Sequence, residues 1–227
     1  MTKESLEKMI EEYFYWLTYI DSCFELHEYL YSAEKQYLAQ MNIAPAFFQL
    51  SRSALIHTAI IDLSKFYDKD KRAAISLRKL LVTCKENKSL FKKKYFEDNS
   101  PLLRNAFTDG NNIDMDKILQ GFFDCLDGKD GGKLPEYVTK LKELRDKKLA
   151  HLDENADEFI SCKGGLTRIM ARTLIDTAIG MCRKLSVCLT GKDNLCQSSN
   201  ALDVEDLLKK LKEINVGDNY GTERRKQ

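Results

Sequence analysis

An arginine, an acid and a histidine stand close together in "ELRDKKLAHLDEN", residues 143–155. Arg145 is followed directly by Asp146, and His151 comes after five residues that separate it from Arg145. His151 is one of only three histidines in the chain. Histidine is the side chain whose ordinary pKa lies nearest to neutral pH. These residue types favour chemistry in which an imidazole transfers a proton beside a fixed positive charge.

This group lies at the C-terminal end of an amphipathic helix that Pro135 opens, with a polar loop after it. The helix dipole favours a protonated histidine there by about 0.3–1 kcal/mol, which suits proton transfer. Six residues along an ideal helix rise about 9 Å and leave the two side chains about 120° apart. A second copy of the chain across a two-fold axis brings arginine and histidine together better.

This pair fits a loose pattern, an arginine and a histidine with four to six residues between them. The pattern occurs once more in the chain, because four residues separate Arg52 from His57. About 0.4 matches to so loose a pattern are expected by chance, so spacing alone does not single out either pair. Context separates them. Arg52 and His57 lie in "AFFQLSRSALIHTAIIDLSKFYD", residues 46–68, which is apolar on several faces and predicts a central helix of a bundle. We expect a core role for both, and a partner for Asp62 if it is buried.

The composition predicts a helical globular protein: 43% hydrophobic and 31% charged residues, with 11 glycines and three prolines in 227 residues. A net charge of +1 gives no overall basic field, so nucleic acid would bind at a local patch. Seven scattered cysteines without CxxC, and no secretory or membrane-spanning segment, predict a cytoplasmic protein with reduced thiols. The Cys and His residues do not cluster at the spacing of zinc ligands, and no cofactor-binding motif occurs. We therefore expect no metal and no cofactor.

Apolar residues at steps of three and four predict an all-α fold. The first helical stretch runs to about Tyr37, as one helix or as two with a break near Asp21–Ser22, and its aromatic residues predict core packing plus a dimer contact. Further helices are expected at 46–68, 75–84, 114–126, from Pro135, from a cap at Thr167 to Gly191, and at 203–214. We expect three parts: an N-terminal helical region (1–40) packed on the bundle, the bundle itself (45–190), and a C-terminal helix with a charged tail (191–227).

The segment "RDKKLAHLD" resembles the R-[polar]-x-x-x-x-H motif of HEPN domains, which are helical bundles. The order of "SRSALIHTAIIDLSKFYDKDK", "ISLRKLL" and "LKELRDKKLAHLDE" is similar to the AbiU-type abortive-infection branch of that superfamily, over roughly residues 45–190. This resemblance implies metal-independent RNA cleavage by dimers whose paired motifs form one site. Arg145, Asp146 and His151 are the residues that carry over, with Asp146 where Asn is more usual.

In this interpretation His151 exchanges protons with the ribose 2′-oxygen or the leaving 5′-oxygen, and Arg145 stabilises charge on the phosphate. Four lysines are candidates for holding the RNA backbone: Lys140, Lys142, Lys147 and Lys148. Three functions stay open: a ribonuclease of antiphage or toxin type with an antitoxin or defence partner, a catalytically inactive HEPN bundle that binds nucleic acid or protein as a dimer, and a helical scaffold with a coincidental Arg–His pair.

Overall fold

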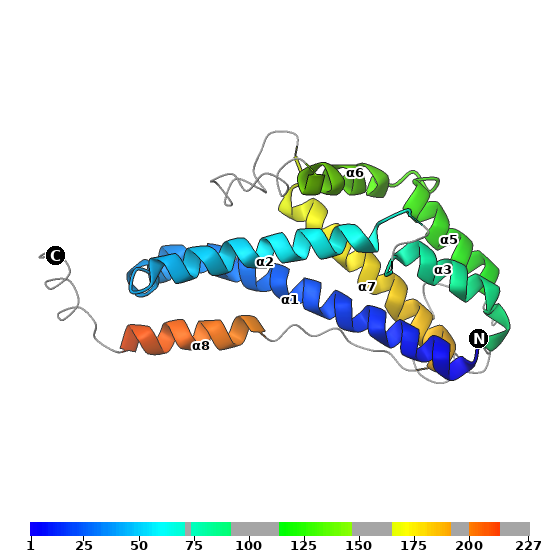
Figure 1. Cartoon of the computed structure of the whole chain (residues 1–227), viewed down its shortest axis with the longest axis horizontal. Coiled ribbons are helices and arrows are strands. Elements are labelled where there is room, and N and C mark those ends of the chain that lie inside the picture. Colours follow the sequence, from blue (N-terminus) through cyan, green and yellow to red (C-terminus); the bar gives the residue numbers. More distant parts are fainter. Residues whose placement is uncertain (71–73, 92–113, 147–164, 192–199, 214–227) are drawn as a thin grey trace, which may run out of the picture. The chain divides into compact units, whose positions relative to one another are not determined.

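The computed structural model describes residues 1–70, 74–91, 114–146, 165–191 and 200–213 (Figure 1). This part of the chain contains α-helices and one short 3-10 helix, with no strand, which confirms the all-α fold. The elements are α1 (Lys3–Met41), α2 (Pro45–Phe66), α3 (Leu77–Glu86), η1 (Lys88–Leu90), α5 (Met115–Asp127), α6 (Leu134–Leu144), α7 (Arg168–Thr190) and α8 (Asn200–Glu213).

The first helical stretch is one helix, α1, which continues through Asp21 and Ser22. Of the two arrangements expected there, the unbroken one is therefore confirmed. Its single departure from helical backbone angles comes later, at Tyr37, with φ −123° and ψ 26°. The aromatic residues of its first half divide between core and surface, because Tyr13 and Phe14 are buried whereas Tyr15 is 70% exposed.

Local signals in the sequence set the helix ends. Thr167 caps α7, since its Oγ1 accepts a hydrogen bond from the backbone N–H of Met170 at 3.2 Å. Gly191 ends α7 in the left-handed conformation, with φ 78°. Gly128 ends α5 with φ 71°, and a Cβ at this position would lie 2.8 Å from Cγ of Pro135. A glycine is thus needed where α5 turns into α6, the helix that carries Arg145.

The chain divides into two compact units, each built from two separate stretches of sequence. Unit 1 comprises Met1–Ile20 and Ile60–Cys196, and unit 2 comprises Asp21–Ala59 and Gln197–Gln227. The division into parts 1–40, 45–190 and 191–227 stays a prediction. The two units are described separately below.

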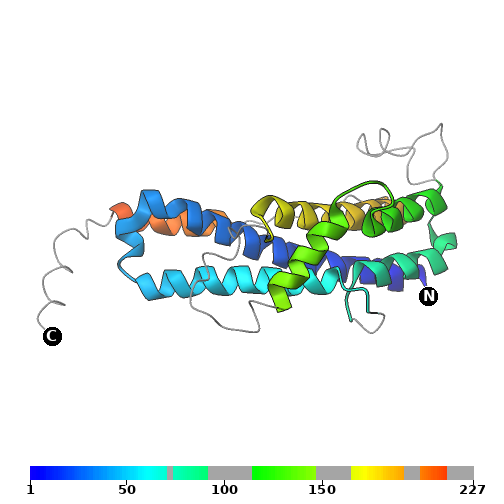
Figure 2. The ribbon, with the colours of Figure 1, turned by 90° about the horizontal axis from the view of Figure 1, so that it is seen from above.

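In unit 1, α5 packs against α3 and α6, and α6 packs against α7. Two buried tyrosine hydroxyls join distant segments: Tyr13 donates to the carbonyl of Ser76 at 3.0 Å, and Tyr67 donates to the carbonyl of Leu174 at 2.6 Å. Apolar residues recur along α7 at steps of three and four. Leu174, Ala178, Met181, Leu185 and Cys188 are buried, and Met170 at the start of this stripe is partly buried. Figure 2 shows α6 running obliquely across the C-terminal end of α2, where Arg145 meets Ser64.

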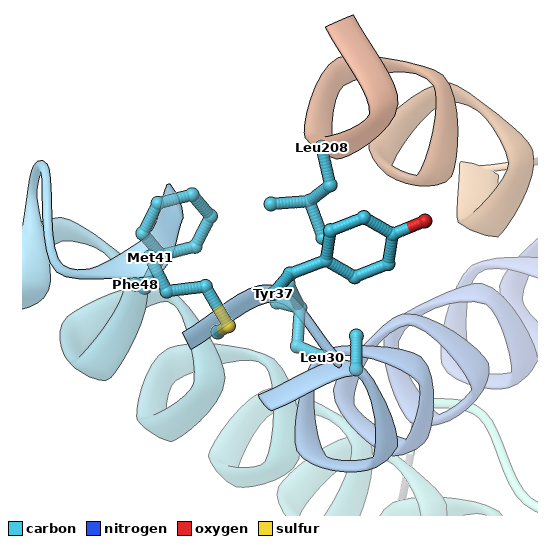
Figure 3. Close-up of a cluster of buried hydrophobic side chains, with 6 residues drawn as sticks. Leu30, Tyr37, Met41, Phe48 and Leu208 are labelled. Atoms are coloured by element: carbon cyan, nitrogen blue, oxygen red, sulfur yellow. The ribbon is translucent and has the colours of Figure 1, made fainter. Parts of the chain in front are cut away.

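Unit 2 is held by a small apolar cluster from three helices (Figure 3). Tyr37 and Leu208 face each other from α1 and α8, and Met41 and Phe48 lie beside them. Lys212 of α8 covers the Tyr37 ring, with Nζ 5.6 Å from the ring centroid. The short apolar stripe of α8 is therefore sufficient to close this unit's core.

Two further predictions concern thiols and membranes. Cys84 and Cys188 are buried thiols in unit 1, and burial raises the pKa of each to about 12. They are therefore small core residues and not nucleophiles. Within the described part of the chain, no helix combines the length and apolar character that crossing a bilayer requires.

Candidate functional site

The two Arg–His matches of the sequence lie in different environments, and Arg52 is structural. The Arg52 side chain is 8% exposed and its Nη1 donates to Oε2 of Glu34 at 2.8 Å. The guanidinium carbon also lies 5.2 Å from the centroid of the Tyr31 ring. Its backbone carbonyl lies 3.1 Å from Nδ1 of the buried His27. The core role predicted for Arg52 is confirmed, and these contacts bind α2 to α1 within unit 2.

His57, the partner of Arg52 in the motif, is half-buried, and desolvation lowers the pKa of its imidazole. It is therefore held in the neutral form expected of a core histidine. Asp62, the remaining polar interruption of α2, accepts a hydrogen bond from Lys65 of the next turn at 2.6 Å. The partner that its burial would require is thus present.

Arg145 occupies a more open position at the end of α6. Leu134, Val138, Leu141 and Leu144 of this helix are buried, at steps of three and four. Arg145 follows Leu144 directly and keeps helical backbone angles, and Arg145 and Asp146 together form a wider π-helical turn. The Arg145 side chain is 32% exposed and that of Asp146 is 61% exposed. Arg145 therefore lies at the boundary between the packed face of α6 and solvent.

Two neighbours hold the Arg145 guanidinium. Nε donates to Oδ1 of Asp146 at 2.7 Å, a short charge-assisted hydrogen bond. Nη1 donates to Oγ of Ser64 at 3.5 Å, which is a weak contact by its length. Ser64 is fully buried on α2 and its own hydroxyl donates to the carbonyl of Ile61 at 2.7 Å, so its oxygen is oriented to accept from Arg145.

A second pair of opposite charges lies beside the first. Lys142 of α6 places Nζ 3.6 Å from Oδ1 of Asp68, just beyond the end of α2. The hydrogen bond that Arg145 donates to Asp146 is the main cause that raises the pKa of Arg145, and the charge of Asp68 adds to it. The same hydrogen bond lowers the pKa of Asp146. We call the group formed by Ser64, Asp68, Lys142, Arg145 and Asp146 the Arg145 corner.

The Arg145 corner contains two basic side chains, Lys142 and Arg145, and two carboxylates, Asp68 and Asp146. It is therefore close to neutral as a whole, and an incoming phosphate competes with Asp146 and Asp68 for the cations. Next to it lies a cavity of about 20 Å³, lined by Phe66, Tyr67, Asp68, Lys69, Leu77, Arg78, Leu126 and Val138. That volume is room for about one water molecule. This cavity is therefore too small for a nucleotide.

The other predicted site residues either lie outside the Arg145 corner or fall outside the described residues. Lys140 pairs with Glu136 one turn back along α6, at 2.9 Å, so it is an ordinary helix ion pair. Lys147, Lys148 and His151 lie outside the described residues. The structure thus brings together Arg145, Asp146 and Lys142 of the predicted set.

Sequence reasoning missed Ser64 and Asp68. Ser64 lies in the last turn of α2, and Asp68 follows two residues after the helix ends. The only sign of these two residues in the sequence was that both are polar and stand at the end of a long apolar run. Nothing in it links that pair to Arg145, because the link comes from packing between segments 81 residues apart.

Comparison with known proteins identifies one family. The family model HEPN_AbiU2, described as AbiU2, matches residues 3–207. The match is longer than the stretch 45–190 on which the sequence resemblance rested, since it also covers α1 and the first half of α8. No curated protein and no solved structure matches the chain.

Proposed function

This chain belongs to the AbiU2 family of HEPN proteins, and on that premise we propose that it is a metal-independent endoribonuclease of abortive-infection defence. It acts against phage or as the toxin of a toxin–antitoxin pair. In this proposal Arg145, Asp146 and His151 of two protomers form one composite site.

One observation carries the proposal: the guanidinium of Arg145 is oriented but not enclosed. Asp146 accepts from Nε and Ser64 accepts from Nη1. Neither contact uses Nη2, and in this proposal Nη2 binds the phosphate. A cation held before substrate arrives stabilises developing charge without first having to reorganise. Arg52, by contrast, is too buried to meet a substrate.

The reaction uses the nucleophile that RNA itself supplies. The ribose 2′-oxygen attacks the adjacent phosphorus, the bond from phosphorus to the 5′-oxygen breaks, and the products are a 2′,3′-cyclic phosphate and a 5′-hydroxyl. His151 accepts the 2′-hydroxyl proton or donates a proton to the 5′-oxygen. Arg145 binds the phosphate oxygens as their charge grows. Asp146 orients the arginine, and Lys142 adds positive charge for the RNA backbone.

Helix geometry and the composition of the motif support a dimer. Arg145 ends α6 and His151 comes six residues later, so helical continuation would direct the two side chains about 120° apart. Two motifs facing across a two-fold axis supply two arginines and two histidines to one phosphate. One histidine then serves as base and the other as acid.

The experiment incubates the purified chain with total RNA in excess EDTA. Wild type is compared with Arg145→Ala, His151→Ala and the matched control Arg172→Ala. Arg172 resembles Arg145 closely, since it is 30% exposed and pairs with Asp176 at 2.7 Å, but it lies on α7. We expect cleavage by wild type and by the Arg172 variant, and a loss on the order of 100-fold or more in the other two. Equal cleavage by all four proteins would contradict the proposal.

A second function has one specific observation in its favour. The two carboxylates of the Arg145 corner balance its two cations, and Asp146 lies 2.7 Å from the guanidinium that would bind phosphate. We therefore also consider a catalytically inactive HEPN bundle that binds nucleic acid or protein as a dimer. A protein that forms dimers, leaves RNA intact in the same assay and is not toxic when overexpressed would favour this alternative.

A further inference from the structure

The first half of α1 exposes aromatic side chains that the core does not use. Tyr15 is 70% exposed, Tyr19 45% and Trp16 37%, although Tyr13 and Phe14 beside them are buried. We call Tyr15, Trp16 and Tyr19 the aromatic patch. All three belong to unit 1, and Trp16 is the only tryptophan in the chain. Three large rings on one exposed helix face are more than isolated surface residues, and such clusters mark interaction sites.

The rings of the aromatic patch meet edge to face. The centroids of Tyr15 and Trp16 are 6.1 Å apart with an angle of 78° between the ring planes. Trp16 and Tyr19 are 6.3 Å apart at 86°. Because the rings are not stacked in parallel, they do not cover one another's faces completely. The face of an indole or phenol ring carries negative potential and attracts ammonium and guanidinium groups.

Carboxylates lie one turn before the aromatic patch. Glu11 and Glu12 are four residues ahead of Tyr15 and Trp16, so they share their side of α1, and both are exposed. Lys8 lies one turn further back and offsets part of that charge, while Glu4 adds to it. The exposed face of α1 from Glu4 to Tyr19 therefore has a net negative charge beside three aromatic rings.

We propose that the aromatic patch and Glu11–Glu12 bind a basic, flexible segment of another protein, with its Arg or Lys side chains against Trp16 and the carboxylates. RNA fits this surface poorly, because its phosphates would approach two carboxylates. A second copy of the chain also fits poorly, because a two-fold contact would bring two faces of net negative charge together. A cationic polypeptide satisfies both the rings and the acids. This inference is independent of ribonuclease activity.

Trp16 reports on the proposed contact directly, since all tryptophan fluorescence of the chain comes from it. The full chain is titrated with hexa-arginine, hexalysine and hexaglutamate peptides while its emission is followed. We expect saturable quenching or a spectral shift with hexa-arginine, weaker binding of hexalysine, and no response to hexaglutamate. Raising the salt concentration to about 0.5 M should weaken the binding, because part of the attraction is electrostatic.

Two double variants test whether the surface is specific. Glu11→Gln/Glu12→Gln removes two carboxylates from the proposed site, and Asp203→Asn/Asp206→Asn removes two exposed carboxylates from α8. Both change the net charge equally and neither touches apolar packing. We expect hexa-arginine affinity to fall about tenfold in the first and to stay unchanged in the second. Equal losses in both would overturn the proposal, because binding would then follow total charge.

The contribution of the rings is tested with Tyr15→Ala and Tyr19→Ala, and with Phe47→Ala as a control for loss of an exposed ring, since Phe47 of α2 is 62% exposed. We expect weaker binding of hexa-arginine in the two tyrosine variants, and wild-type binding with Phe47→Ala. Unchanged affinity in both tyrosine variants would overturn the role of the rings. If Trp16 emission shifts when only the protein concentration is raised, the partner is a second copy of the chain and the proposal is overturned. If the emission shifts on addition of an RNA oligonucleotide, the partner is nucleic acid and the proposal is likewise overturned.

Discussion

Arg52 and Arg145 begin the same sequence pattern and have opposite environments. Arg52 is 8% exposed and reaches a carboxylate 18 residues away, on a different helix. Arg145 is 32% exposed and its carboxylate is the next residue in the chain. The first contact joins α1 to α2, whereas the second holds a side chain in place at a surface. The comparison shows that the helix around an arginine, and not its distance from a histidine, decides its role.

The two arginines also differ in the free-energy cost of removing their charge from water. A guanidinium taken out of water loses hydration that only close partners offset, and Arg52 has both Glu34 and the Tyr31 ring. Arg145 remains near water, so its pair with Asp146 contributes little to folding. Stability should therefore depend on Arg52, and activity on Arg145. The predictions below separate these two roles.

The largest expected effect is on folding. Arg52→Ala should lower the free energy of unfolding by about 2 kcal/mol, because it removes the pair with Glu34 and the packing of the side-chain stem. The figure lies below that for a fully buried pair, since Glu34 is 46% exposed and regains water. Urea denaturation measures the change, with Arg172→Ala as control. An effect no larger than the control's would contradict the structural role of Arg52.

The helices and their caps were predictable because their signals are local. Thr167, Gly191 and the stripe of α7 each depend on residues within a few positions. The exposure of Trp16 was not predictable, since it lies one helical turn after the buried Tyr13 and is nevertheless 37% exposed. The role of Ser64 at the Arg145 corner was hidden because it comes from packing between segments 81 residues apart. His151 lies outside the described residues, so its half of the motif stays a prediction.

The second-largest effect is expected when the shape of the cation at position 145 is changed. Arg145→Lys keeps the positive charge but loses the planar fork that binds two phosphate oxygens at once. We expect RNA cleavage about tenfold slower than wild type, a smaller loss than that of Arg145→Ala. The midpoint of urea denaturation should stay close to that of wild type. Single-turnover cleavage of a defined RNA measures the rate, and full activity in the lysine variant would mean that charge alone is sufficient.

A smaller effect should follow from Asp146→Asn, and it has the opposite sign. Removing this carboxylate frees the Arg145 corner of a competitor for phosphate, so RNA should bind a few-fold more tightly, at the cost of a less firmly oriented guanidinium. The hydrogen bond from Arg145 lowers the pKa of Asp146, so the carboxylate stays charged throughout the range from about pH 5 to 9. The difference in affinity should therefore be constant there and shrink only in strong acid. A difference that varies with pH near neutrality would assign the titration to another group.

The smallest effect is expected at Ser64, and it tests how the guanidinium is held. Its contact with Arg145 is long, at 3.5 Å, while Asp146 holds the same side chain at 2.7 Å. Ser64→Ala should therefore change cleavage less than about twofold. The alanine leaves the Ile61 carbonyl without the serine hydroxyl, and that carbonyl keeps its place in α2, so stability should fall by about 1 kcal/mol or less. A larger loss of activity with little loss of stability would show that α2, and not Asp146, orients Arg145, which would make the two arginines more alike than their exposure suggests.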